Sequence, residues 1–161
     1  MALLNPIRVV SKGQDHCQLI QGNVFLTYTT GPARDEHIGA LVMGLDKFFG
    51  ELPAPEKGAY VLITRGSARP PEGSARRKVQ DAFNRHSRRL SAGAIVIETS
   101  GFTGAVLRTV ASTLFVLSQR GFPVKFFATR AECLPWISES TGQHRTQLAG
   151  LIEHAQMLVG S

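Results

Sequence analysis

Cysteine is scarce in this chain of 161 residues. Its two cysteines, Cys17 and Cys133, lie far apart and form neither a Cys-x-x-Cys pair nor a Cys/His spacing of the kind that binds zinc. A disulfide-dense scaffold is therefore excluded. The pattern favours two small buried hydrophobic residues in a reduced cytosol over a disulfide or a redox role.

Long apolar runs are also missing. The first residues, Met-Ala-Leu-Leu-Asn-Pro, lack the basic start and the extended apolar stretch of a secretory signal. The most apolar helix candidate, residues 105–117, is interrupted by Arg108, Thr109, Ser112 and Thr113 and is too short to cross a bilayer. With 43% hydrophobic and 19% charged residues, the composition is ordinary for a single globular domain. We therefore expect a cytoplasmic protein with no transmembrane segment.

Acidic residues are sparse in one stretch, residues 65–90, which holds eight bases against two acids, Glu72 and Asp81. The bases are Arg65, Arg69, Arg76, Arg77, Lys78, Arg85, Arg88 and Arg89. The rest of the chain holds ten bases and ten acids, so the whole net charge of +6 comes from this stretch. Positive charge this local can steer an acidic partner or gather phosphates.

The apolar pattern predicts strands alternating with helices. Strands are expected at residues 7–10, 17–20, 24–29, 59–64, 94–98 and 124–128, and helices at 33–49, 74–90, 105–119, 130–138 and 144–159. Gly22-Asn23 is a tight-turn signal between two of the strands and predicts a hairpin. This order predicts an α/β fold, with a mixed β-sheet opened by an N-terminal hairpin and later strands parallel. Helices would pack on the sheet, and the last helix would be an addition to the core.

Three segments carry a resemblance to a known family. They are the opening hairpin with its apolar helix, the strand Tyr60–Thr64 followed by a basic helix, and the strand Pro123–Phe127 followed by the helical ending Ala131–Ile137. On these segments the chain from Ile7 to Ile137 resembles a STAS domain of the bacterial SpoIIAA-like and Sec14-like branch. The resemblance implies a non-catalytic regulatory domain over residues 1–142. Residues 143–161 would form a C-terminal helical extension packed on or beside it.

Ser74 is the position in this chain that matches the phosphorylated serine of the anti-sigma-factor antagonists in that family. Those proteins carry an aspartate just before the serine, whereas Gly73 precedes Ser74 here and the Asp-Ser pair is absent. From the residues alone, Ser74 is expected to be the N-cap of the following helix, where its oxygen would accept a first-turn N–H. A phosphosite remains the alternative, because a phosphate would meet both the helix end and Arg76 or Arg77.

The basic helix is the first candidate binding surface. On a helical projection Arg77, Lys78, Arg85, Arg88 and Arg89 fall within about 120° of one another, opposite Val79, Ala82, Phe83 and Leu90. The stripe could be a solvated face. A binding surface is supported by its single acid and by Arg76, Arg77 and Lys78, which lie in the first turn, where cations oppose the helix dipole. With Arg69 and Ser74, these residues form the predicted site for a partner or an anion.

A second loop, residues 99–104, also lies between a strand and a helix N-terminus, a place where α/β sheets bind ligands. Ser100, Phe102 and Thr103 are its candidate contacts, although the loop lacks the Gly-Lys-Ser/Thr ending of a phosphate loop. Phe102 could equally be a residue that only fills the turn.

No catalytic or metal-binding spacing stands out. The five histidines show no metal spacing, and Glu98 ends its strand without a partner that the sequence identifies. We therefore predict no catalytic residues, no metal and no cofactor. The leading hypothesis is a domain that binds an acidic protein partner through residues 66–89. The alternative is a module that holds a nucleotide or an anionic lipid headgroup at helix N-termini. Nucleic acid is disfavoured, because few aromatics accompany the arginines.

Overall fold

The computed structural model of the chain describes residues 5–65, 71–98 and 121–160. Arg69, Ser100, Phe102 and Thr103, and the helix expected over residues 105–119, lie outside the described residues. No described helix is long and apolar enough to cross a membrane.

Six strands form one mixed sheet in the order β1-β2-β3-β4-β5-β6. They are β1 (Arg8–Lys12), β2 (His16–Gln21), β3 (Val24–Thr29), β4 (Gly58–Arg65), β5 (Leu90–Glu98) and β6 (Val124–Phe127). The first three strands are antiparallel, and β3 to β6 are parallel. Gln21 pairs with Val24, so Gly22 and Asn23 form the two-residue turn, with Gly22 at a φ of 57°. The predicted mixed α/β sheet with its opening hairpin is confirmed.

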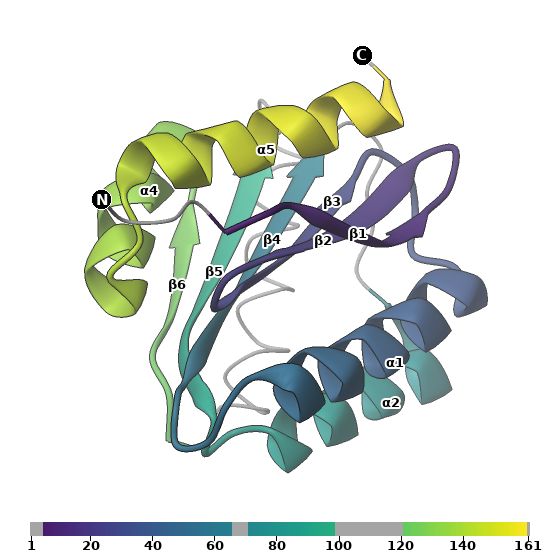
Figure 1. Cartoon of the computed structure of the whole chain (residues 1–161). Coiled ribbons are helices and arrows are strands. Elements are labelled where there is room, and N and C mark those ends of the chain that lie inside the picture. The colour runs from purple at the N-terminus through teal and green to yellow at the C-terminus, as the bar shows by residue number, and fades with distance from the viewer. Residues whose placement is uncertain (1–4, 66–70, 99–120, 161) are drawn as a thin grey trace.

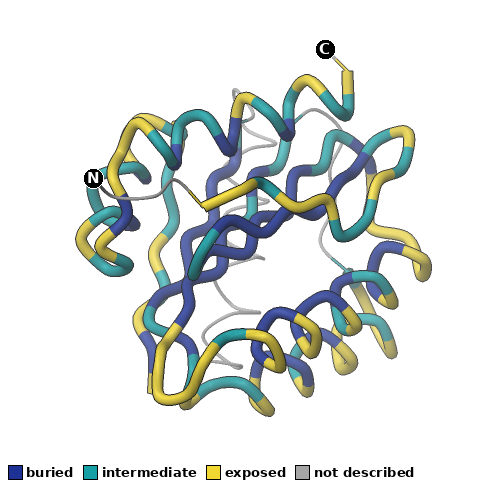
Figure 2. The backbone as a smooth tube through the Cα atoms, in the orientation of Figure 1, coloured by how far each residue is buried: buried dark blue, intermediate teal, exposed yellow. Residues whose placement is uncertain are grey.

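Helices cover both faces of this sheet (Figure 1). The described helices are α1 (Asp35–Glu51), α2 (Gly73–Arg85), α4 (Arg130–Thr141) and α5 (Arg145–Val159). Helices α1 and α2 lie side by side on one face, and α4 and α5 lie on the other. Figure 2 shows that the central strands are buried and that the helices turn their exposed residues outward.

The first core lies between the sheet and the helices α1 and α2. Helix α1 buries Ile38, Leu41, Leu45, Phe48 and Phe49, which recur every three or four residues along one side. They pack against Phe25 and Tyr60 of the sheet and Phe83 of α2. The acids Asp35 and Glu36 in the first turn suit the helix dipole.

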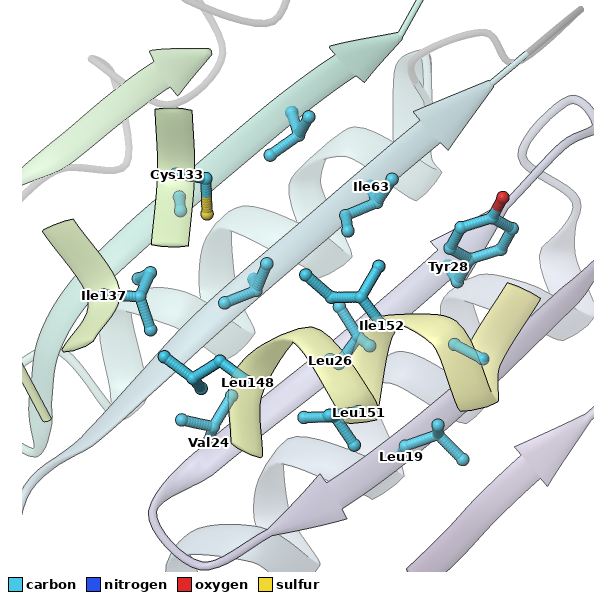
Figure 3. Packing of buried hydrophobic residues seen from close by; sticks show 14 of the residues in the cluster. Leu19, Val24, Leu26, Tyr28, Ile63, Cys133, Ile137, Leu148, Leu151 and Ile152 are labelled. Atoms are coloured by element: carbon cyan, nitrogen blue, oxygen red, sulfur yellow. The ribbon is translucent and has the colours of Figure 1, made fainter. Parts of the chain in front are cut away.

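The second core lies beneath α4 and α5 (Figure 3). Leu148, Leu151, Ile152 and Ala155 of α5 pack against the same cluster of strand residues as Ile137 of α4. Buried Gln143, between the two helices, donates from Nε2 to the carbonyl of Gln21 and to Asn23 Oδ1, both at 2.8 Å. These hydrogen bonds fasten the connection between α4 and α5 to the opening hairpin.

Both cysteines are buried in this second core and unpaired, as their spacing predicted. Burial raises the pKa of the Cys17 thiol to about 11 and that of Cys133 to about 12. A thiol that stays protonated at neutral pH is a poor nucleophile. These cysteines therefore behave as small hydrophobic residues.

The predicted end of α2 is wrong. The helix ends at Arg85, residues 86–89 form a turn, and Leu90 already pairs with Gly58 as the first residue of β5. Arg88 and Arg89 therefore do not lie on the helix, and the predicted five-residue basic stripe does not exist as one face. Leu90 is buried because it belongs to the sheet, not to the apolar side of α2.

Candidate functional site

The beginning of α2 presents three consecutive cations. Arg76, Arg77 and Lys78 are all exposed, and none forms an ion pair with another described residue. No acid lies in the first turn of α2, and the N-cap residue Glu72 is the acid at this helix end. We call these three residues the basic turn of α2.

Ser74 does not cap this helix, and the N-cap prediction is wrong. Glu72 occupies the N-cap position and its side chain makes no cap hydrogen bond, while Ser74 lies one residue inside the helix and is exposed. The helix begins at Gly73, whose φ of 57° is left-handed, and this is two residues earlier than a Ser74 cap would require. The hydroxyl of Ser74 is exposed next to the basic turn, and the phosphosite stays a prediction.

Arg85 joins α2 to α1 through an ion pair with Asp46. Its guanidinium donates to Asp46 Oδ1 at 3.1 Å, and His86 Nε2 lies 2.7 Å from the same oxygen. The hydrogen bond with His86, reinforced by Arg85, holds the pKa of Asp46 below its usual value. The sequence did not indicate the contact between Arg85 and Asp46, because Asp46 lies 39 residues before Arg85.

Arg89 is also engaged within the fold. Its guanidinium donates to the carbonyls of Leu52 at 2.9 Å and Glu56 at 3.0 Å, and it lies over the ring of Phe49 at 5.8 Å from the centroid. This arginine fastens the end of α1 and the loop after it to the turn before β5. Arg88, its neighbour, is exposed and forms no ion pair with the described residues.

Another charged group lies at the carboxyl ends of the parallel strands. Arg130, the first residue of α4, holds Glu98 through two hydrogen bonds of 2.7 and 3.2 Å. The same guanidinium lies 5.9 Å from the ring centroid of Tyr28, whose hydroxyl accepts from Arg65 at 3.4 Å. Glu98 thus has the partner that sequence reasoning did not find. The pair ties β5 to α4.

A third cluster contains two histidines, and their spacing in the sequence did not indicate that they meet. Asp15 precedes β2, His16 begins it, and His37 lies in the first turn of α1. One ligand atom from each of these residues lies within 4.8 Å of the others, and the two imidazole rings are 3.7 Å apart between centroids. This is a possible metal-ligand set among the described residues, and the expectation from spacing did not include it.

Comparison with known proteins identifies the fold. No protein-family model matches the sequence, and no curated protein matches it. Among solved structures, the chain is similar to an uncharacterized protein of the DUF3478 family from Shewanella loihica PV-4, which has a SpoIIAA-like fold. The match covers 85% of this chain and 98% of that protein, with a TM-score of 0.50 and 16% sequence identity. The chain has a SpoIIAA-like fold.

The family resemblance of residues 7–137 is therefore confirmed at the level of the fold. At 16% identity the likeness concerns the arrangement of strands and helices and assigns no functional residue. Within this SpoIIAA-like fold, the basic turn follows the central strand β4 in the chain, and the Asp15, His16 and His37 cluster lies beside the end of β3. Both lie toward the carboxyl ends of the parallel strands, the edge at which α/β sheets commonly bind ligands.

Proposed function

We propose that this chain is a non-catalytic regulatory domain of the cytoplasm that binds an acidic surface of a protein partner through the basic turn of α2. The observation that carries the proposal is the charge of that turn. Arg76, Arg77 and Lys78 are exposed and form no ion pair with an acid among the described residues, so their charge is open to an acidic partner. A surface selected only for stability would place acids there.

A protein partner fits this surface better than nucleic acid. Binding of single strands uses exposed aromatic rings on which bases stack. Phe83 of α2 and Phe49 of the neighbouring helix α1 are both buried. Arg85 and Arg89 are also held by other parts of the fold, which leaves a small cationic patch instead of an extended groove.

The test replaces Arg76, Arg77 and Lys78 together with glutamate. A matched control reverses the charge of Lys47, Lys57 and Arg145, which are also exposed but lie on α1, the loop before β4 and α5. Partners are captured from the native cytoplasm, and the affinity of the recovered protein is then measured for wild type and both variants. We expect the basic-turn variant to lose at least about tenfold, or 1.4 kcal/mol, and the control to bind normally.

Thermal stability separates binding from a structural role. Arg76, Arg77 and Lys78 are exposed and form no ion pair with a described residue, so the melting temperature of the basic-turn variant should stay within about 4 °C of that of wild type. A fall of more than about 4 °C would show that the cations support the fold. Unchanged affinity for the partner, or an equal loss in the control, would contradict the proposal.

The N-terminus of α2 also suits an anionic small ligand, such as a nucleotide or a lipid headgroup, because the first N–H groups of a helix lack partners within it and exposed cations follow them in the chain. This second candidate makes a different prediction. Nucleotides or inorganic phosphate would raise the melting temperature of wild type with concentration and would not affect the basic-turn variant. No shift up to millimolar concentrations would remove this candidate and leave the protein partner.

A further inference from the structure

Three buried polar atoms face one another without hydrogen-bond partners. They are Asp15 Oδ1, His16 Nδ1 and His37 Nε2. The carboxylate oxygen lies 3.7 Å from the nitrogen of His16 and 3.5 Å from that of His37. Both separations exceed the length of a hydrogen bond. The side chains of the two histidines are each only 9% exposed, so water does not readily replace the missing partners.

Such an arrangement is unfavourable as it stands. Buried polar atoms in folded proteins nearly always have a partner, and an unmatched one destabilises the fold. Here one carboxylate oxygen and two imidazole nitrogens all lie within 4.8 Å of one another. A cation placed between them would satisfy all three at once.

The surrounding residues hold this set in place. Asp15 Oδ2 accepts from the Arg34 guanidinium at 2.8 Å, which turns Oδ1 toward the histidines. The outer nitrogen of His16, Nε2, lies 3.5 Å from Ser11 Oγ. Outer contacts of this kind orient the ligands of metal sites.

Two glycines provide room for the side chains of the cluster, because they have no Cβ atom. A Cβ at Gly13 would collide with His16 Cε1, and one at Gly31 would collide with Asp15 Oδ2. Neither glycine has a positive φ, so room for the side chains, not backbone conformation, requires glycine at these positions.

We propose that Asp15, His16 and His37 bind one divalent transition-metal ion, for which Zn²⁺ is the best match. Imidazole nitrogen with carboxylate oxygen is a ligand set typical of zinc, whereas Mg²⁺ and Ca²⁺ prefer oxygen alone. Zinc lies about 2.0–2.2 Å from such ligands, so neighbouring ligand atoms around it are roughly 3.4 Å apart. The separations of 3.5 and 3.7 Å from Asp15 agree with this value.

Two charged side chains flank the cluster, Arg34 beside Asp15 and Glu36 beside His37. Arg34 opposes a second cation, but its side chain is 51% exposed and solvent screens its charge. The exposed carboxylate of Glu36 lies 3.6 Å from His37 Nε2, so this carboxylate or water can take the fourth position.

The ion would connect two parts of the fold. Asp15 and His16 belong to the turn before β2 and its first residue, and His37 belongs to α1. A shared metal would therefore fasten α1 to the antiparallel edge of the sheet, and its removal should loosen this contact.

The test uses the full chain, stripped with a chelator and dialysed. Co²⁺ is titrated while its visible absorption is followed, and Zn²⁺ is then used to displace it. We expect one ion per chain and a higher melting temperature with Zn²⁺. His16→Gln and His37→Gln should each weaken binding by at least about 100-fold, since loss of even an outer contact costs about 10–100-fold. The control His154→Gln, on α5 across the sheet, should bind like wild type.

A measurement on the wild-type chain keeps the test independent of how the variants fold. Zn²⁺ should shift the ring signals of two of the five histidines in an NMR spectrum, and these should be assigned to His16 and His37. Absence of stoichiometric binding, or equal binding by His37→Gln and His154→Gln, would overturn the proposal. Either result is independent of the partner that the basic turn binds.

Discussion

At the scale of single residues, the two cysteines give a direct measure of how closed the second core is. Cys17 and Cys133 are buried, and their pKa values are raised to about 11 and about 12. Cys17 Sγ also donates to the carbonyl of Ala155, at 3.6 Å. We expect neither thiol to react with a water-soluble disulfide reagent in the folded chain up to about pH 9, and both to react in denaturant. Rapid reaction of one thiol in the folded chain would show that α4 and α5 open readily.

Two adjacent arginines differ in what they contribute to stability. Arg89 donates to the carbonyls of Leu52 and Glu56 and lies over Phe49, whereas Arg88 is exposed and forms no ion pair with the described residues. Hydrogen bonds from a charged group are worth about 1.5–3 kcal/mol when well formed. Since Arg89 is partly exposed, we expect Arg89→Ala to lower the free energy of unfolding by about 1–3 kcal/mol.

The matched control for that variant is Arg88→Ala, which should change the free energy of unfolding by less than about 0.5 kcal/mol. Urea denaturation of the two variants and wild type supplies the measurement. Equal effects of the two substitutions would mean that the contacts of Arg89 do not support the turn before β5.

At the scale of elements, α2 shows where a local pattern misleads. Residues 86–89, His-Ser-Arg-Arg, contain neither glycine nor proline, so nothing in the sequence marks the end of the helix before Leu90. The helical projection also placed Leu90 among the buried residues. The helix ends at Arg85 because residues from Leu90 onward pair with β4, a partner more than 30 residues away in the chain. Pairing over such a distance cannot be detected in a helical window.

The candidate sites show the same division between local and distant information. The charge of the basic turn was evident from the sequence, because its residues are consecutive. The contacts of Arg85 with Asp46 and of Glu98 with Arg130 depend on how elements pack, and spacing did not indicate them. His37 likewise meets Asp15 and His16 only because the hairpin and α1 bring residues about 20 positions apart together.

At the scale of the whole molecule, the order of elements was predictable because most strands and helices carry a clear period of their own. The hairpin turn at Gly22-Asn23, the apolar side of α1 and the strands β4 and β6 all lie within a residue or two of the predicted bounds. The sequence did not predict how the helices divide between the two faces of the sheet. Nothing local in α5 says which face it covers, since several apolar strand residues are available on either side.

Helix α5 is expected to be an integral part of the fold. It buries Leu148, Leu151 and Ile152 over the sheet, and Gln143 before it is bonded to the hairpin. Replacing Ile152 with alanine should lower the free energy of unfolding by about 2–5 kcal/mol, as is usual for a buried large aliphatic residue. Met157 lies on the same helix but is 77% exposed, so Met157→Ala should change it by less than about 0.5 kcal/mol.

Removal of residues 143–161 is the stronger test of the same idea. It would expose the apolar strand residues of the second core, such as Leu19 and Leu26, and leave Gln21 and Asn23 without Gln143. We expect the shortened chain to lose its cooperative thermal transition and to aggregate, because a large apolar face of the sheet would meet water. A cooperative transition close to that of wild type would show instead that residues up to 142 fold alone, and that α5 is an accessory covering of this face.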